Sequence, residues 1–214
     1  MKFLLKLSNL ILFSSLLYGC QYYSNFNLKN YCDYYSLNCE KKNLTITFIT
    51  SKGLIKAELF GSSTPLTVAN FISNTENGIY EKRNFYKIVD FPNNKILHGG
   101  IYSTKNNEFS EKKFNKNNRI PLEIKKINIK EPIYKIQISK PMNLKNIENK
   151  FEKGSIAMVK MDHQHSSSTE FFITLNRSSE LDGRYSVFGK VIEGYDVLNK
   201  IELHDFIKKI EINN

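Results

Sequence analysis

The 214-residue chain lacks most features that mark common classes of enzyme and nucleic-acid-binding protein. It has no glycine-rich phosphate loop and no constellation of serine, histidine and aspartate typical of hydrolases. His163 and His165 lack the cysteine or carboxylate frame of a metal site, so we expect no metal ion and no cofactor. The 31 basic residues outnumber the 21 acidic ones and give a net charge of +10. These basic residues are dispersed and form no RNA- or DNA-binding motif, so we expect no nucleic acid partner.

The apolar stretch near the N-terminus, residues 10–17, is too short to cross a bilayer, which takes about 20 residues. Lys2 and Lys6 flank its start, and it leads into Leu17-Tyr18-Gly19-Cys20, an arrangement typical of an export signal. This box resembles a bacterial lipobox, although Tyr18 stands where a small or aliphatic residue is usual. An ordinary signal peptide cleaved at another bond is the alternative. We expect a signal peptide over residues 1–19 and an acylated Cys20, which would make the chain a bacterial lipoprotein anchored on the extracytoplasmic side of a membrane.

Only two further cysteines are present, Cys32 and Cys39. After export they would meet an oxidising compartment, where a small disulfide loop is geometrically possible. Two unpaired thiols are an equally good interpretation, and the sequence leaves both open. Residues 20–42 are polar and lack sustained periodicity, so we interpret them as a tether between lipid and domain.

Alternating apolar residues predict that the domain, residues 43–214, opens with a β-hairpin. Strands at residues 44–48 and 54–60 flank a turn at Ser51-Lys52-Gly53. Ser63-Thr64-Pro65 then predicts the start of a helix, with a hydroxyl residue as its cap and proline in its first turn. Val68, Phe71 and Ile72 share one face of this helix, which should cover the sheet.

The most informative stretch runs from Gly154 to Val191. An apolar strand enters a polar loop rich in serine and histidine, and the chain returns as a strand headed by Phe171-Phe172. A tight Leu181-Asp182-Gly183 turn then leads into a third strand that begins at Val187. Further on, residues 195–201 predict a short helix and residues 206–212 a closing strand.

In order, spacing and residue type this stretch resembles the second half of a cyclophilin, a peptidyl-prolyl cis-trans isomerase. Residues 52–71 resemble the first hairpin and helix of that family. The resemblance implies a mainly β fold, a closed eight-stranded antiparallel barrel with an α-helix over each end and the active site on an outer face. Residues of about 105–150 do not follow the family and form a segment rich in lysine and asparagine. Within it, residues 127–139 alternate as an inserted hairpin or long loop would.

Isomerisation requires no nucleophile, metal or cofactor. It requires a grip on the proline ring and a hydrogen-bond donor aimed at the prolyl nitrogen, which favours the twisted amide over the planar one. In cyclophilins the donor is an arginine, and Lys87 occupies its position here. Lysine keeps the charge but loses the planar fork of donors. The alternative is a surface lysine that has lost this role.

The remaining site residues also follow from the resemblance. Phe172 would floor the proline pocket, with Leu181, Ile96 and Tyr185 around it and Phe91 as the candidate for a further aromatic. His98 and Glu170 stand where the family has glutamines, and Glu170 could pair with Lys87. Val159 and Lys160 would line the peptide groove. Each apolar residue could instead be ordinary core.

The resulting hypothesis is a monomeric isomerase of weakened activity that acts on proline-containing polypeptides and assists the folding of exported proteins. The alternative is a non-catalytic module that binds proline-containing peptides or a partner protein through the same groove or through the basic insertion. Lys87, His98 and Glu170 discriminate between the isomerase and the binding module. All three differ from the polar residues of the family at one site, which puts catalysis, rather than the fold, in doubt.

Overall fold

The structure is a computed structural model that describes residues 27–91, 94–101, 119–162 and 164–213. The predicted signal peptide, Cys20, His163 and part of the predicted insertion lie outside these residues.

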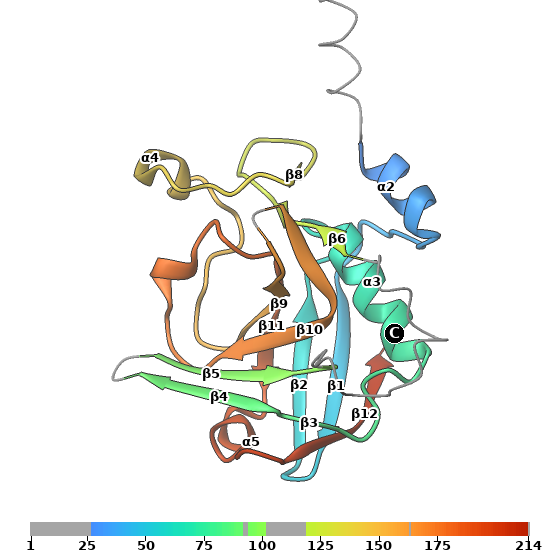
Figure 1. The fold of residues 1–214 in the computed structure, drawn as a ribbon, viewed down its shortest axis with the longest axis vertical. Coiled ribbons are helices and arrows are strands. Elements are labelled where there is room, and N and C mark those ends of the chain that lie inside the picture. Colours follow the sequence, from blue (N-terminus) through green and yellow to red (C-terminus); the bar gives the residue numbers. More distant parts are fainter. Residues whose placement is uncertain (1–26, 92–93, 102–118, 163, 214) are drawn as a thin grey trace, which may run out of the picture.

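A strongly curled antiparallel sheet of ten strands dominates the fold (Figure 1). Its strands follow the order β3-β12-β1-β2-β11-β9-β10-β5-β4, and β6 pairs with β10 at the side. The strands are β1 (Leu44–Thr50), β2 (Leu54–Leu59), β3 (Arg83–Asn84), β4 (Lys87–Phe91), β5 (Asn94–Gly99), β6 (Ile120–Pro121), β9 (Ser155–Lys160), β10 (His165–Thr174), β11 (Val187–Glu193) and β12 (Phe206–Asn213).

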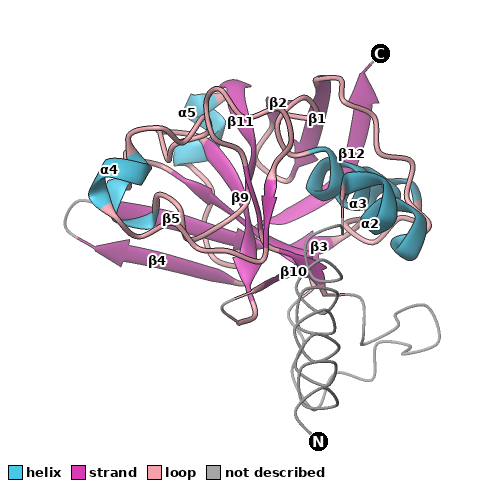
Figure 2. Cartoon of the chain, turned by 90° about the horizontal axis from the view of Figure 1, so that it is seen from above, coloured by secondary structure: helices cyan, strands magenta, loops and turns pink. Residues whose placement is uncertain are grey.

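The predicted opening hairpin, helix near residue 195 and closing strand are all present. Helix α3 (Pro65–Glu76) and helix α5 (Tyr195–Asn199) accompany the sheet, as expected. Two further helices, α2 (Leu28–Tyr35) and α4 (Pro141–Leu144), and the 3₁₀ turn η1 (Ser179–Leu181) were not predicted. No helix in the described ranges has the length and apolar character needed to cross a membrane. Figure 2 shows the helices at the periphery of the sheet.

The prediction of a closed eight-stranded barrel is wrong. The sheet is open, with β3 at one edge and β4 at the other. These edges are nevertheless consecutive in the chain, since only Phe85 and Tyr86 separate them. The N–H of Phe85 bonds to the Asp205 carbonyl on the β12 side, whereas the N–H of Tyr86 bonds to the His98 carbonyl on β5. Two consecutive residues thus donate their backbone N–H groups to opposite edges of the sheet. β3 and β4 therefore do not pair with each other in a regular ladder.

An aromatic cluster fills the inside of the curled sheet. Phe71 of α3 stacks on Tyr80 with ring centroids 4.8 Å apart and meets Phe188 at 5.1 Å. Phe48 and Phe171 contribute from β1 and β10, with their ring centroids 5.8 Å apart. All five side chains are fully buried or nearly so. The predicted apolar face of α3 therefore does cover the sheet.

The N-terminus of α3 departs from the expected hydroxyl cap. Thr64 is the cap residue, but its hydroxyl makes no cap hydrogen bond and donates instead to the Phe60 carbonyl. The Glu123 carboxylate accepts from the backbone N–H groups of Leu66 and Thr67, at 3.3 and 2.8 Å. A carboxylate can replace a hydroxyl here because free N–H groups and the helix dipole both favour negative charge.

Glu123 is fully buried and belongs to the predicted insertion. It lies on β7 (Glu123–Ile124), which pairs with β8 (Ile133–Tyr134) to form the hairpin that was one of two predicted possibilities for this region. Each strand has two residues, and residues 125–132 join them. The hydroxyl of Tyr134 also donates to Glu123, at 3.1 Å. The insertion is therefore integrated into the domain through a buried polar group.

The described part of the expected tether is ordered against the domain. Helix α2 buries Leu28, Tyr31 and Cys32 beside Leu66 of α3. Cys32 and Cys39 form a disulfide, which decides between the two possibilities left open by the sequence. This helix was not predicted from the sequence, because its buried residues are few and its surroundings are polar.

Candidate active site

A row of side chains crosses the outer side of the sheet. Lys87 of β4 lies opposite His98 of β5, and His98 lies opposite Phe172 of β10. Phe172 in turn lies opposite Ala157 of β9, and Ala157 opposite Val187 of β11. Residues directly opposite one another in a sheet project from the same face. The predicted donor and the predicted pocket floor therefore share one face, and the neighbours of Phe172 on β10 point into the core.

Close approach of β5 to β10 depends on glycine. Gly100 adopts a φ of 98°, and a Cβ there would lie 2.2 Å from the carbonyl oxygen of Thr169. Any other residue would push the end of β5 away from β10 and disturb the row.

Most of the predicted pocket residues come together around Phe172. The side chain of Phe172 is only 3% exposed and packs in a cluster with Phe151, Ala157 and Val187. Partly buried apolar side chains border this cluster: Phe60, Ile96, Val159, Leu181 and Tyr185. The joint register that the sequence implied is thus realised in space for Ile96, Val159, Phe172, Leu181 and Tyr185. Phe91 belongs to β4, but its side chain lies outside the described part of the structure.

Aromatic contacts fix the orientation of the pocket floor. The Phe151 and Phe172 rings are nearly parallel, with centroids 5.7 Å apart and an interplanar angle of 6°. Tyr185 meets Phe172 edge-on at 5.1 Å, and the His98 ring stacks on Phe172 at 5.7 Å. Offset and edge-on pairs are the arrangements that aromatic rings prefer. Sequence reasoning missed Phe151, because a single aromatic residue before a strand carries no distinctive pattern.

Lys160 lies at the rim of the pocket. Its ammonium group sits 5.6 Å from the centroid of the Tyr185 ring, within cation–π range. Lys160 and Tyr185 are both half-buried. The contact places a positive charge beside the Tyr185 ring, which packs edge-on against Phe172.

His98 is held neutral by its surroundings. Burial, followed by the positive charge of Lys87, lowers the pKa of His98 to about 4. At neutral pH the imidazole therefore has one N–H donor and one acceptor nitrogen. A glutamine side chain offers both kinds of group as well, so His98 keeps the hydrogen-bonding capacity that the resemblance implied at this position.

Glu170 has a partner that the sequence did not predict. The sequence offers Lys87 as its partner, but in the structure the Tyr86 hydroxyl donates a hydrogen bond to Glu170 at 2.9 Å. Glu170 is buried, with 7% of its surface exposed, whereas Lys87 is exposed. Tyr86 thus supports a buried carboxylate beside the row.

The geometry defines a class of site. It is a cluster of aromatic and apolar side chains, set on the outer face of a curled antiparallel sheet, with an exposed ammonium group two strands away. Among the described residues, no three histidine, cysteine, aspartate or glutamate side chains are placed to hold a metal ion. The site can grip an apolar ring and offer hydrogen bonds to the backbone around it.

Comparison with known proteins identifies this class. Residues 45–213 match the family described as cyclophilin type peptidyl-prolyl cis-trans isomerase/CLD. The chain is 29% identical over 165 residues to peptidyl-prolyl cis-trans isomerase B of Escherichia coli, with coverage of 73% of this chain and 83% of the relative. It is 28% identical over 172 residues to a peptidyl-prolyl cis-trans isomerase of Helicobacter pylori, with coverage of 79% and 86%.

Solved structures show the same fold. A cyclophilin type peptidyl-prolyl cis-trans isomerase of Cryptosporidium parvum superposes with a TM-score of 0.56 at 24% identity, covering 81% of this chain and 99% of that one. A second structure of that protein, determined in the presence of the dipeptide Ala-Pro, matches with a TM-score of 0.54 and coverage of 79% and 99%.

The chain belongs to the cyclophilin-type peptidyl-prolyl cis-trans isomerases. It is accordingly an isomerase by family, and the predicted resemblance is confirmed.

Proposed function

We propose that the chain is a slow isomerase of X–Pro bonds in exported proteins, acting as a monomer, with Phe172 as the floor of the proline pocket and Lys87 as the hydrogen-bond donor. The single observation that carries this proposal is the row that sets Lys87, His98 and Phe172 side by side on one outer face. The Cryptosporidium relative in the presence of Ala-Pro supports a proline-containing peptide as the ligand.

The chemistry is the removal of amide resonance. Rotation about a peptide C–N bond faces a barrier of about 18–20 kcal/mol, because the planar amide has partial double-bond character. The pocket around Phe172 would hold the pyrrolidine ring while the preceding residue rotates. A donor aimed at the prolyl nitrogen stabilises the pyramidal nitrogen of the twisted state and does little for the planar one.

Lys87 can perform this role with reduced precision. An ammonium group is a point charge on a flexible stem, whereas a guanidinium presents a rigid fork of donors. The difference corresponds to about 1–3 kcal/mol of transition-state stabilisation, or roughly a 5- to 150-fold lower rate. Neutral His98, stacked on Phe172, would donate to or accept from the peptide backbone beside the ring.

We also propose export and acylation at Cys20. The lysine-flanked apolar stretch and the Leu17-Tyr18-Gly19-Cys20 box support it. The disulfide between Cys32 and Cys39 is an independent support, since disulfides persist in oxidising compartments and are rare in the cytosol. Clients would then be other exported chains that fold near the same membrane surface.

A pocket variant tests where the peptide binds. Tyr185 is half-buried at the rim, so Tyr185→Ala should leave the fold intact and weaken binding of a proline tetrapeptide about fivefold or more. Tyr34→Ala is the matched control, because Tyr34 is 72% exposed on α2. The measurement is an NMR titration with exchange spectroscopy of the two proline isomers. Binding with no exchange enhancement would favour the non-catalytic module, and shifts confined to residues 119–150 would place the ligand elsewhere.

A further inference from the structure

The insertion carries a concentration of exposed apolar side chains. Ile127, Ile129, Ile136 and Met142 are 49, 43, 58 and 80% exposed. The other large exposed apolar side chains of the described residues are scattered along the chain. Apolar side chains gathered in one exposed segment mark an interaction surface more often than isolated ones do.

The same segment is strongly basic. Residues 125–145 contain six lysines and one acidic residue, Glu131. Lys41 neutralises Glu131 with an ion pair of 2.7 Å. Lys125 donates to the Lys130 carbonyl of the same segment at 2.7 Å, which leaves the other lysines to set the surface charge. We call these lysines, together with the four exposed apolar residues, the insertion face: Lys126, Ile127, Ile129, Lys130, Lys135, Ile136, Lys140, Met142 and Lys145.

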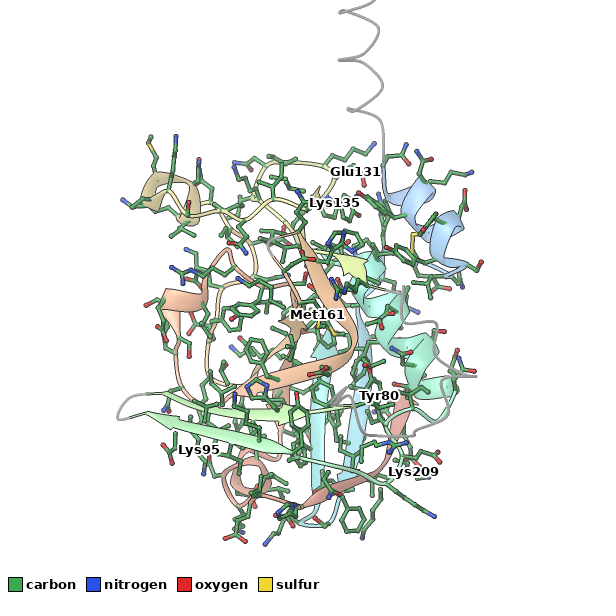
Figure 3. All side chains as sticks on the ribbon, in the orientation of Figure 1. Tyr80, Lys95, Glu131, Lys135, Met161 and Lys209 are labelled. Atoms are coloured by element: carbon green, nitrogen blue, oxygen red, sulfur yellow. A yellow bond between two sulfur atoms is a disulfide. The ribbon has the colours of Figure 1, made fainter. Side chains whose placement is uncertain are left out.

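The start of the described chain lies at this end of the molecule. Figure 1 shows the beginning of α2 at the same end as β8 and α4, and Figure 3 shows Glu131 and Lys135 there. Helix α2 is fixed to this end. The Tyr31 and Tyr134 rings lie 4.7 Å apart, and the Tyr35 hydroxyl donates to the Arg119 carbonyl at 2.7 Å.

A lipid on Cys20 would therefore act at short range. The chain from Cys20 to Asn27 can extend to at most about 25 Å. Because α2 is fixed to this end, the lipid would keep the start of α2 within about 25 Å of the membrane surface. The end of the molecule with the insertion face would be the end nearest to the lipid headgroups.

We propose that the insertion face docks on the surface of a bilayer that contains anionic lipids. Its lysines pair with lipid phosphates, and its isoleucines and methionine enter the boundary between headgroups and acyl chains. Apolar side chains combined with lysines fit this boundary, where the attraction to anionic lipid adds to apolar burial. The pocket elements β9, β10 and η1 lie below this face in Figure 1, so docking leaves them open to polypeptides at the membrane. The biological setting rests on the export proposed above.

The test uses a chain of mature length, residues 20–214, with Cys20→Ser so that no lipid is attached. Every described element begins at Leu28 or later, so this chain contains the whole described fold. Flotation with vesicles of phosphatidylcholine alone is compared with flotation with vesicles that also contain phosphatidylglycerol. We expect binding to the anionic vesicles only. Each lysine near an anionic surface strengthens binding about fivefold, so Lys130→Gln with Lys140→Gln should weaken it at least about tenfold.

Matched variants separate the face from general charge. Lys200→Gln with Lys208→Gln removes the same charge near the opposite end and should change binding less than about twofold. Ile136→Ser with Met142→Ser should lower the binding that survives in high salt, whereas Leu54→Ser with Leu203→Ser should not. Leu54 and Leu203 are 58 and 49% exposed, so this control also removes two exposed apolar side chains.

Two outcomes would overturn the proposal: no binding to anionic vesicles, or equal losses in the face variants and their controls. The second would mean that the vesicles attract only the net positive charge of the chain. Failure of acylation is distinguishable, because it would leave the vesicle binding of the Cys20→Ser chain unchanged.

Discussion

Replacement of Lys87 by arginine is the sharpest test of the catalytic mechanism. The residue is exposed on β4, an edge strand, so a longer side chain meets no packing constraint. Arginine keeps the positive charge opposite His98, and the pKa of His98 therefore stays low. The substitution consequently changes the geometry of the donor and little else. Lys87→Ala, in contrast, removes the charge as well as the donor and should raise the pKa of His98.

The expected gain in kcat/KM comes from the second N–H group that an arginine side chain can aim at the substrate. A guanidinium that aims two N–H groups at the prolyl amide should recover about 1–2 kcal/mol, or roughly 5- to 30-fold in kcat/KM. Lys87→Ala should lower kcat/KM so far that isomerisation with the enzyme is barely faster than isomerisation in buffer. Combining Lys87→Arg with Glu170→Gln should raise the rate further, because a neutral amide beside the row leaves the guanidinium free for substrate.

The assay is kcat/KM on a proline tetrapeptide, with Lys95→Arg as the matched control. Lys95 lies on β5 opposite Asp90 in the same hairpin, away from the row that holds His98. Wild-type activity equal to buffer, with no gain from the double change at positions 87 and 170, would refute the donor role and favour the binding module.

Four further predictions concern pH, stability and anchoring. The pKa of His98 is lowered from 6.5 to about 4, so the contribution of neutral His98 to stability is complete above pH 6.5 and is lost as the pH falls toward 4. In His98→Gln, the Tm from thermal unfolding should therefore depend less on pH between 6.5 and 4. Burial raises the pKa of Glu123 to about 7, so its protonated form stabilises the fold below pH 4.5 and this contribution is lost as pH rises through 7. Glu123→Ala should lower the free energy of unfolding by about 2–5 kcal/mol, measured by urea titration, because it orphans buried N–H groups of α3. Reduction of the Cys32–Cys39 disulfide should speed hydrogen exchange in α2 but not in the sheet. The cross-link closes a short loop, and its loss should destabilise that loop by about 2 kcal/mol. Cys20→Ala should abolish incorporation of labelled fatty acid.

Each of these has a contrary result. If His98→Gln leaves the loss of stability between pH 6.5 and 4 unchanged, burial of His98 is not its cause. A Glu123→Ala variant as stable as wild type would contradict the capping role of Glu123. Unchanged exchange in α2 after reduction would mean that packing alone holds the helix. Wild-type protein that takes up no fatty acid and is released in soluble form would exclude the lipoprotein.

The sequence predicted the parts of the fold that depend on local periodicity. Alternation in residues 44–60 specifies the hairpin because one face of each strand must be buried, and the spacing of Val68 and Phe71 does the same for α3. Phe172 and Leu181 were predictable as pocket residues only through their joint register in a known family. Their neighbour Phe151 was not, since nothing local distinguishes it from ordinary core.

Long-range polar contacts explain the other failures. The side chain of Glu123 caps α3 by accepting a hydrogen bond from the Leu66 N–H. Glu123 lies 57 residues after Leu66, and no local pattern predicts such a partner. Tyr86 and Glu170 are 84 residues apart for the same reason. The open sheet reflects the geometry of two residues, Phe85 and Tyr86, whose hydrogen bonds diverge, and strand counting cannot detect this.

The pairing of the first and last strands also controls when the molecule can fold. β1 lies between β2 and β12, and the Asn213 side chain donates to Thr47, 166 residues earlier in the chain. During synthesis, β1 and β2 can form their hairpin early, but one edge of β1 stays exposed until β12 has been made. Contacts of such long sequence separation are slow to form. This cyclophilin-type isomerase is thus itself a late-folding chain, because β12, the last strand in sequence order, completes the sheet.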